Sequence, residues 1–384
     1  MLEEQQSQEI FDEVISWRRY FHQFPELGFE EYKTSAKLQA MLAECGISFE
    51  VMAGTGVVGV LEGNGEGRTV AIRADMDALP IQEEVDLPFA SRHPGVMHAC
   101  CHDAHMATVL GVAKMLSRAR DRLRGRFKFL FTPSEESPPG GVLPMIRAGA
   151  IDDVDCVLGM HYSDLPREKI WIGKGTIQAN VDAFEIVIRG KGGHGAFPHQ
   201  TNDPVVAAGY LITLLQTIVS RETSPLDSVV VTIGSVNAGT AFNVIPDRAV
   251  LKGTARTFTA DLRARVEERI RQTVEATCQN FGCQGSVSYR REYPANVNDP
   301  NLAEEVRRLA AEFLPEDSFI DVPPTMGGDD FGYFAQKVPT CYIRIGRGTA
   351  EESGPNHSGK MVFDEDVLPL GTRLFAVLAA RLAE

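Results

Sequence analysis

The sequence predicts an α/β protein in which helices sandwich a mixed, largely parallel sheet, with a ferredoxin-like α+β domain inserted into it. Apolar strand-like runs alternate with helix-like runs at both ends of the 384-residue chain, which is typical of a parallel sheet with crossover helices. Between them the order changes to strand–helix–strand–strand–helix–strand, the split βαβ pattern. We therefore expect a first domain built from 1–179 and 296–384, interrupted by an inserted domain at 180–295.

The elements of the first domain follow from apolar spacing and from turn residues. Helical spacing stops before Pro25 and again at Gly46, and the turn-rich GNGEGR separates two short strand-like runs. We expect helices at 7–23, 30–45, 105–116, 141–150, 302–314 and 367–383, and strands at 57–63, 69–75, 126–133, 155–162 and 339–346.

The inserted domain is of ordinary size, with about 115 residues. We expect strands at 182–190, 228–236, 248–258 and 285–293, a long apolar helix at 202–220 and a charged amphipathic helix at 259–282.

The charge balance argues against a nucleic-acid partner, because 38 Lys and Arg oppose 52 Asp and Glu and no local basic cluster offsets the net charge of −14. The polar, acidic start MLEEQQSQEI has neither the cationic nor the apolar region of a secretory leader. No apolar run reaches the ~18 residues that a membrane span needs. We expect a cytoplasmic protein without a membrane segment.

Seven cysteines are an odd number, spaced too irregularly for a disulfide framework. Five of them lie among apolar residues and are expected to be buried free thiols, namely Cys45, Cys156, Cys278, Cys283 and Cys341. Cys100 and Cys101 differ, because they lie in MHACCHDAHM, where three of the nine histidines accompany an aspartate. This density of titratable groups indicates a site.

Predicted strands also deliver ionisable residues to one edge of the sheet. Three strands run into such groups: Asp75 and Asp77, Glu135 and Glu136, and His161. In open α/β sheets, ligand sites form outside the carboxyl ends of the strands. Any one of these groups alone would suit a solvated strand end, but together they favour a functional site.

The segment MHACCHDAHM is expected to be a loop that enters a helix, with Asp103 as the N-cap. Cys100 and His102 are one residue apart, so both can face the same ion. Zinc, cobalt, nickel and manganese suit a mixture of thiolate, imidazole and carboxylate ligands. A structural zinc site would favour CxxC pairs, which the chain lacks. The alternative is an ordinary capped helix with a core histidine.

Glu135 and Glu136 are adjacent, so their side chains cannot both point the same way. One can bind a metal while the other accepts a proton from the water that the metal activates. The alternative is a surface acidic pair, since the neighbouring prolines would suit a loop in either case.

Within the inserted domain, His194 stands between two glycines, whose small size lets a ring approach a ligand closely. The surrounding GKGGHGAFPH lacks the spacing of a phosphate-binding loop. Asn243 and Arg256 offer an amide and a guanidinium for a carboxylate. Each of these three residues alone would suit a structural role.

Taken together, the motifs resemble those of the dinuclear-metal amidohydrolase and carboxypeptidase family, in the branch of hippurate hydrolases, N-acyl-amino-acid amidohydrolases and plant auxin-conjugate hydrolases. They occur in family order over nearly the whole chain: RRYFHQFPELGFEE, RADMDALP, MHACCHDAHM, FTPSEES, GMHY, GKGGHGAFPH, FNVIPD, MGGDDFGYF and NHSG.

The resemblance implies a zinc-peptidase-like fold and two divalent metal ions per subunit, of zinc, manganese, cobalt or nickel. It implies that Cys100 bridges the two ions, in the place of an aspartate in related carboxypeptidases. It further implies one ion on His102 and His161, and the other on Glu136 and His357.

The resemblance also implies roles for the remaining site residues. Glu135 would be the general base and then the general acid, and Asp77 would orient a ligand imidazole. His194 would reach from the inserted lid domain, in the neighbouring subunit, to stabilise the oxyanion. Asn243 and Arg256 would contact the substrate, and the lids would pair in a homodimer.

Cys101 departs from the family pattern, which usually has glycine at this position. Cysteine adds a side chain between two proposed ligands, so we expect a passive thiol beside the metals. An exposed thiol near a cation would also oxidise readily.

The function that the resemblance implies is hydrolysis of the amide bond of N-acyl amino acids, including aryl-acyl ones. A dipeptidase or carboxypeptidase with the same dinuclear site is the alternative. Two further classes are a thiol hydrolase that uses Cys100 or Cys101 with His102, and a binding protein without chemistry. The presence of Glu135 together with all five proposed ligands argues against the binding protein.

Overall fold

The computed structural model describes the backbone from residue 4 and the side chains from residue 7 to Glu384. The first three residues of MLEEQQSQEI, the segment on which the expectation of no leader rests, therefore lie outside the described residues. The chain divides into two compact units, one of Met1–Ile177, Val297–Pro323 and Asp330–Glu384, the other of Gln178–Asn296 and Pro324–Asp329. The short Pro324–Asp329 segment returns to the second unit after the main insertion, which the sequence did not indicate.

The first unit is built on a seven-stranded sheet in the order β1-β2-β4-β3-β5-β15-β6. The central neighbours β4, β3, β5 and β15 are parallel and the edge pairs antiparallel. The predicted mixed, largely parallel sheet is thereby confirmed. The strands are β1 (Ser48–Met52), β2 (Gly56–Glu62), β3 (Thr69–Asp75), β4 (Arg126–Thr132), β5 (Cys156–Ser163), β6 (Ile170–Trp171) and β15 (Thr340–Gly346).

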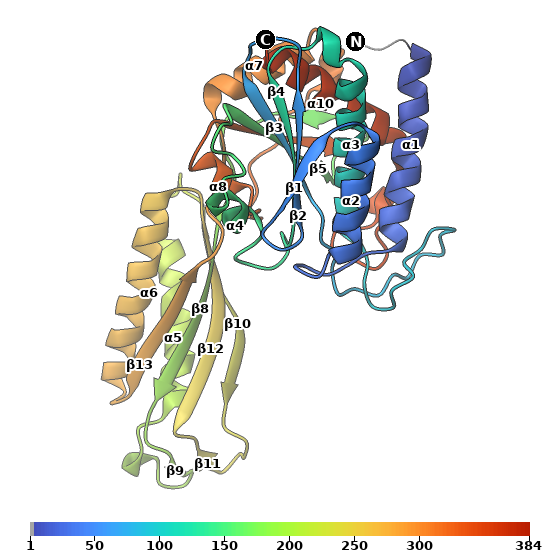
Figure 1. Cartoon of the computed structure of the whole chain (residues 1–384). Helices are drawn as coiled ribbons and strands as arrows, with labels where there is room; N and C mark the ends of the chain where they lie inside the picture. The colour runs from blue at the N-terminus through green and yellow to red at the C-terminus, as the bar shows by residue number, and fades with distance from the viewer. Residues whose placement is uncertain (1–3) are drawn as a thin grey trace. The chain divides into compact units, whose positions relative to one another are not determined.

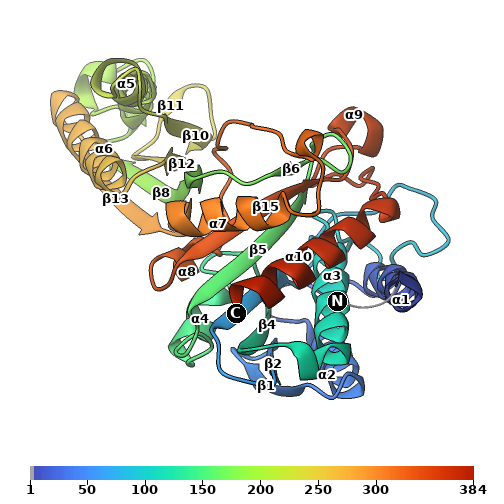
Figure 2. The same ribbon diagram turned by 90° about the horizontal axis from the view of Figure 1, so that it is seen from above.

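Helices cover both faces of this sheet (Figure 2). Successive residues of a strand point to opposite faces, so Val70 and Ile72 pack in one core cluster and Ala71 in another. The first cluster includes side chains of α1 (Glu4–Gln23), α2 (Tyr32–Glu44), α3 (His102–Arg118), α7 (Pro300–Ala310) and α10 (Leu368–Leu382). The second includes those of α4 (Val142–Arg147) and α8 (Gly332–Ala335).

Every helix and strand predicted for the first domain occurs in the structure, with ends shifted by a few residues. Strand β1 was missed, because its residues are mostly exposed and give no apolar run. Shorter elements were also missed, namely β6, α8, α9 (Ala350–Ser353), β7 (Gly175–Gln178) and β14 (Asn296–Asn298), the last two of which pair with each other.

The second unit has a four-stranded sheet in the order β10-β12-β8-β13, antiparallel throughout, which is the arrangement of a split βαβ fold. Helices α5 and α6 pack on one face of it (Figure 1). The elements are β8 (Asn180–Arg189), α5 (Pro204–Thr217), β10 (Val229–Ala238), β12 (Arg248–Thr257), α6 (Ala260–Asn280) and β13 (Gln284–Arg291). A two-stranded ribbon, β9 (Gly193–His194) with β11 (Val244–Ile245), completes the unit.

Helix α5 and the turn that follows it form one apolar segment, Pro204–Glu222. It is long and apolar enough to cross a membrane by length and composition, although the sequence predicted no such run. In this structure Ala207, Leu211 and Leu215 pack in the core of the second unit. The opposite face of α5 leaves Tyr210 60% exposed. This segment is therefore a packed helix with one uncovered apolar face.

Candidate metal centre and active site

Three neighbouring parallel strands end at the same edge of the first sheet and carry the predicted site residues there. Asp77 follows β3, Glu135 and Glu136 follow β4, and His161 lies near the end of β5. The loop before α3 and the first residue of α3 bring Cys100 and His102 to the same edge. The carboxyl edge of the sheet therefore holds the site, as expected for this class of fold.

The predicted metal donors of the first unit are close together. The ligand atoms of Cys100, Glu136 and His357 all lie within 4.8 Å of one another, and so do those of His102, Glu135 and Glu136. Cys100 Sγ also lies 3.3 Å from His161 Nε2. Cys100 and Glu136 thus connect all the predicted donors in one cluster with two halves.

His102 is oriented as a metal ligand should be. Its Nδ1 lies 2.8 Å from the backbone oxygen of Asp77 and 3.3 Å from Asp77 Oδ1. The buried Nε2 has no hydrogen-bond partner in the part of the chain that the structure describes. It faces Asp75 Oδ2 at 3.6 Å and Glu135 Oε2 at 3.9 Å. A nitrogen left unpaired among carboxylates fits a cation.

The pKa values of the two histidines also indicate that this cluster of carboxylates favours a positive charge. Burial alone would lower the pKa of His102, but the surrounding carboxylates, first Asp75 and then Asp77, raise it to about 10. Burial lowers the pKa of His161 well below its usual value, so this imidazole is neutral and free to bind a metal. The donor set is therefore chemically suited to divalent cations.

Cys100 is a poor nucleophile in these surroundings. Burial raises the pKa of its thiol well above the usual value, and the charges of Glu136 and Glu135 raise it further. A reactive cysteine needs a lowered pKa, whereas a coordinated thiol is deprotonated by the metal itself. The structure therefore favours a metal ligand over the thiol hydrolase considered from the sequence.

Asp77 holds the turn that carries the two glutamates. Its Oδ1 accepts the backbone N–H of Glu135 and its Oδ2 that of Glu136, each at 3.0 Å. Ser134, one residue earlier, has a left-handed backbone with φ of 56°. Its N–H donates to the buried Glu31 Oε1 at 2.9 Å. Three consecutive N–H groups are thus fixed by two buried carboxylates.

Glu31 was missed from the sequence, because an acidic pair before a helix gives no sign of a distant partner. Its other oxygen accepts the hydroxyl of Thr55 at 2.6 Å, and burial raises its pKa. Asp75 was named only as a strand end. It is fully buried and accepts from Arg73 Nη1 at 2.7 Å and His105 Nδ1 at 2.6 Å.

Two expectations about the loop before α3 were wrong. Asp103 is not the N-cap, because α3 begins at His102 with Cys101 in the cap position and without a side-chain cap bond. The Asp103 carboxylate instead forms an ion pair with Arg18 and a hydrogen bond with His22, each at 2.8 Å. Cys101 is fully buried, not exposed, and burial raises its pKa to about 12.

Cys101 does adopt the conformation for which glycine is suited. Its φ is 66°, in the left-handed region that most residues avoid. The departure from the family pattern therefore adds a buried thiol and leaves a glycine-like backbone in place.

The other predicted site residues lie in the second unit. His194 and Asn243 are close on the β9–β11 ribbon, where the N–H of Gly195 donates to the Asn243 oxygen at 2.8 Å. Both are exposed. Arg256 lies near the opposite end of β12, paired with Val181 and Val230. Within this unit, the ribbon groups and Arg256 are therefore separate.

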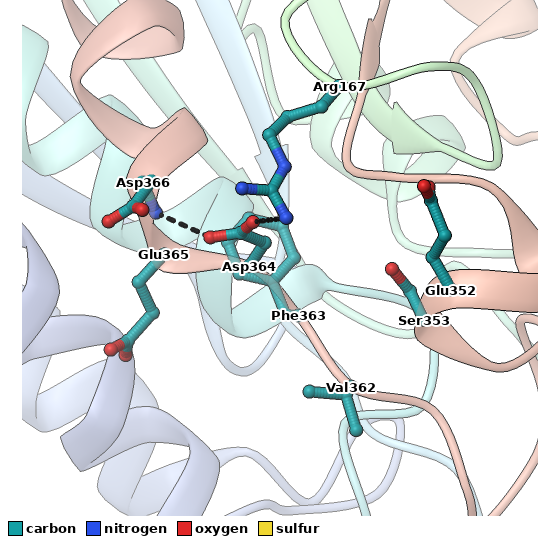
Figure 3. Close-up of a pocket in the computed structure, with 8 residues that line it drawn as sticks. All are labelled: Arg167, Glu352, Ser353, Val362, Phe363, Asp364, Glu365 and Asp366. Carbon is teal, nitrogen blue, oxygen red and sulfur yellow. Dashed lines mark hydrogen bonds and ion pairs between the residues drawn. The ribbon is translucent and has the colours of Figure 1, made fainter.

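A pocket of about 380 Å³ in the first unit is not this site (Figure 3). Its lining is largely acidic, but Asp364 pairs with Arg167, and Glu365 accepts from Arg19. Its eight lining residues include none of the predicted donors. Two of its carboxylates are therefore engaged in ion pairs within the protein.

Comparison with known proteins agrees with this geometry. The Peptidase family M20/M25/M40 matches residues 71–381. The chain belongs to this family. The N-acetylcysteine deacetylase of Bacillus subtilis is 38% identical over 97% of both chains. The IAA-amino acid hydrolase ILR1-like 2 of Arabidopsis thaliana is 39% identical, over 99% of this chain and 88% of that one.

Two further M20 comparisons bear on the site. The thermostable carboxypeptidase 1 of Saccharolobus solfataricus is 38% identical over 98% of this chain and 96% of that one. The crystal structure of the Bacillus subtilis YxeP protein, a dinuclear metal binding M20 peptidase, superposes with a TM-score of 0.85 at 34% identity, covering 98% and 99% of the two chains. The predicted family, fold class and metal-dependent amidohydrolase class are thereby confirmed, and two divalent ions as cofactors are supported.

Proposed function

We propose that this M20 enzyme hydrolyses the amide bond of N-acyl amino acids, including aryl-acyl ones, and releases a carboxylic acid and an amino acid. The observation that carries the proposal is Glu135, placed by Asp77 beside a five-donor cluster at the carboxyl edge of the sheet. The names of the deacetylase and IAA-amino acid hydrolase relatives support an acyl amino acid as substrate.

Five residues of the first unit would hold the two ions. Cys100 would be shared, His102 and His161 would hold one ion, and Glu136 and His357 the other. When bound, the ions polarise the scissile carbonyl and lower the pKa of water.

Glu135 moves the proton. In the proposed reaction its carboxylate takes a proton from the water that attacks the amide carbon, and gives it to the nitrogen as the carbon–nitrogen bond breaks. Asp77 keeps this carboxylate and that of Glu136 in place through their backbone N–H groups. Of the two adjacent glutamates, Glu135 thus transfers the proton and Glu136 binds metal.

The second unit would bind the substrate and stabilise the oxyanion. We assign these roles to His194, and with it Asn243, because they lie together and exposed on the β9–β11 ribbon. Arg256, near the other end of β12, would contact a substrate at a different point. We propose that His194 acts in the site of a neighbouring subunit.

A homodimer through the second unit would supply that neighbour. The uncovered face of α5 carries Val206, Tyr210 and Leu214 at helical spacing, and β10 is an edge strand of its sheet. A second copy of the same unit could cover this face. We further propose that the enzyme is cytoplasmic.

A substrate screen tests the proposal. The purified enzyme is supplied with Mn²⁺ and offered hippurate, N-acetyl amino acids and indole-acyl amino acids, with free dipeptides and C-terminally unblocked peptides alongside. We expect turnover of the N-acyl amino acids. Preferential cleavage of the peptides would replace the proposal with the carboxypeptidase alternative, which the relative from Saccharolobus solfataricus represents.

A further inference from the structure

Two arginines, Arg344 in β15 and Arg347 just after it, contact segments that carry proposed metal ligands and are not proposed ligands themselves. Arg347 is fully buried and Arg344 is partly buried. Arg347 lies one residue beyond β15, and its guanidinium binds a different part of the chain from that of Arg344. The two guanidinium groups therefore serve different surroundings.

Arg347 closes the loop that carries His357. Its Nη2 donates to the oxygen of Gly354 at 2.8 Å and to Asn356 Oδ1 at 2.9 Å, while Nη1 donates to the oxygen of Val362 at 3.0 Å. These acceptors lie on both sides of His357. One buried guanidinium thus joins the two ends of the loop.

The charge of Arg347 is balanced by a carboxylate that is not one of the proposed metal ligands. Nη2 also donates to Asp164 Oδ1 at 2.5 Å, on the segment that follows β5. A buried charge needs such a partner. Because the Arg347–Asp164 pair has no net charge, it does not repel a cation bound at the donor cluster.

His357 needs this support more than the other donors do. Its φ of 59° is unfavourable for a residue with a side chain, and the side chain is 51% exposed. Its N–H donates to the Ala99 oxygen at 2.8 Å, and its Nε2 lies 3.1 Å from Glu136 Oε1. A strained, half-exposed ligand keeps its place only if the surrounding loop is fixed.

Arg344 acts on the other histidine through Ser163. Its Nε donates to Ser163 Oγ at 3.0 Å, and this hydroxyl lies 3.3 Å from both His161 Nδ1 and the His161 oxygen. If Nε2 of His161 binds a metal, Nδ1 carries the proton and donates to Ser163 Oγ. The hydroxyl can then donate to the His161 oxygen, so every group in this chain is satisfied.

The two histidines belong to different halves of the cluster. His357 forms a set with Cys100 and Glu136. His161 lies outside that set and approaches Cys100 separately, with its Nε2 at 3.3 Å from Sγ. Arg347 therefore supports the half of the cluster that contains His357, and Arg344 supports the half that contains His161.

We propose that Arg347 and Arg344 are positioning residues, each of which sets the affinity of one of the two metal ions, the first through the His357 loop and the second through Ser163 and His161. The inference rests on the proposed dinuclear function. Losing such an outer partner typically weakens metal binding by about 10–100-fold.

The test is calorimetric titration of metal-free protein with Mn²⁺, which measures binding and not activity. His357→Ala and His161→Ala first identify which binding step belongs to which histidine. Arg347→Lys, which keeps the charge but loses the planar fork, and the milder Asn356→Ala should weaken the His357 step by about 10–100-fold. Arg344→Gln and Ser163→Ala should weaken the His161 step by a similar factor.

The exposed Arg373 of α10 supplies the control, since Arg373→Gln should leave both steps unchanged. If the arginines had a purely structural role, each arginine variant would weaken both binding steps alike, and that result would overturn the inference. Unchanged binding steps in Asn356→Ala and Ser163→Ala would also overturn it. A wild-type protein that binds fewer than two ions would overturn it too. Two bound ions without hydrolysis of N-acyl amino acids would refute the proposed function alone.

Discussion

The backbone N–H of Glu135 donates to Asp77 Oδ1 at 3.0 Å, so the proposed base is placed by a carboxylate that follows the neighbouring strand β3. The other oxygen of Asp77 accepts the N–H of Glu136, and its backbone oxygen lies 2.8 Å from His102 Nδ1. One residue therefore sets the positions of the base and of two proposed ligands.

Replacing Asp77 with asparagine should disturb the positions of Glu135, Glu136 and His102. An amide keeps one oxygen but turns an NH₂ group toward one of the two backbone donors, which leaves that donor unpaired. We expect Asp77→Asn to weaken metal binding by about 10–100-fold and to lower turnover with it. Metal content and hydrolysis rate are measured on the same sample. Asp86→Asn, at an exposed position of the following loop, is the control, and equal behaviour of the two variants would contradict the role of Asp77.

The two adjacent glutamates should separate by phenotype. Glu135→Gln keeps the shape of the side chain but cannot carry the proton, so it should retain metal and lose about 10²–10⁴-fold in rate. Glu136→Ala should instead lose metal, which elemental analysis detects. Near-normal turnover of Glu135→Gln would remove Glu135 from the mechanism.

His194 should act between subunits. His194→Ala is expected to abolish most turnover without loss of metal, because the residue belongs to the second unit and is not one of the proposed donors of the first. Mixing it with Glu135→Gln should restore part of the activity, since one site of a hybrid dimer contains both wild-type groups. If subunits are shown to exchange and no activity returns, the site is built within one chain.

Cys101→Gly should be tolerated. Glycine adopts the φ of 66° without strain, which offsets the loss of a small buried side chain, so stability should change by about 1 kcal/mol or less. Both metals and most activity should remain. Sensitivity to peroxide should match the wild type, because the thiol is buried and its pKa is raised to about 12. Metal loss comparable to that of Cys100→Ala would show that the bridging cysteine is misassigned.

The sequence predicted the structure well where apolar residues recur periodically or where site residues are close together along the chain. Strand β3 was predicted at its observed bounds, since TVAIRAD is a continuous buried run that ends in charge. Cys100 and His102 stood out because titratable groups are dense there. In both cases the signal is local.

What the sequence could not show depends on distant parts of the chain. Glu31 accepts a hydrogen bond from Ser134, more than 100 positions away, and Arg347 binds Asp164, which follows another strand. Neither residue differs from an ordinary surface charge in its local pattern. The N-cap assignment of Asp103 was wrong for the same reason, because Arg18 and His22, on α1, occupy its carboxylate.

Reconstitution of the metal-free enzyme tests the central claim most directly. The enzyme is stripped with a chelator and titrated with Mn²⁺ while hydrolysis of hippurate or an N-acetyl amino acid is followed. The account predicts that activity disappears on stripping and returns in full at two ions per subunit. Hydrolysis that survives complete metal removal would contradict it.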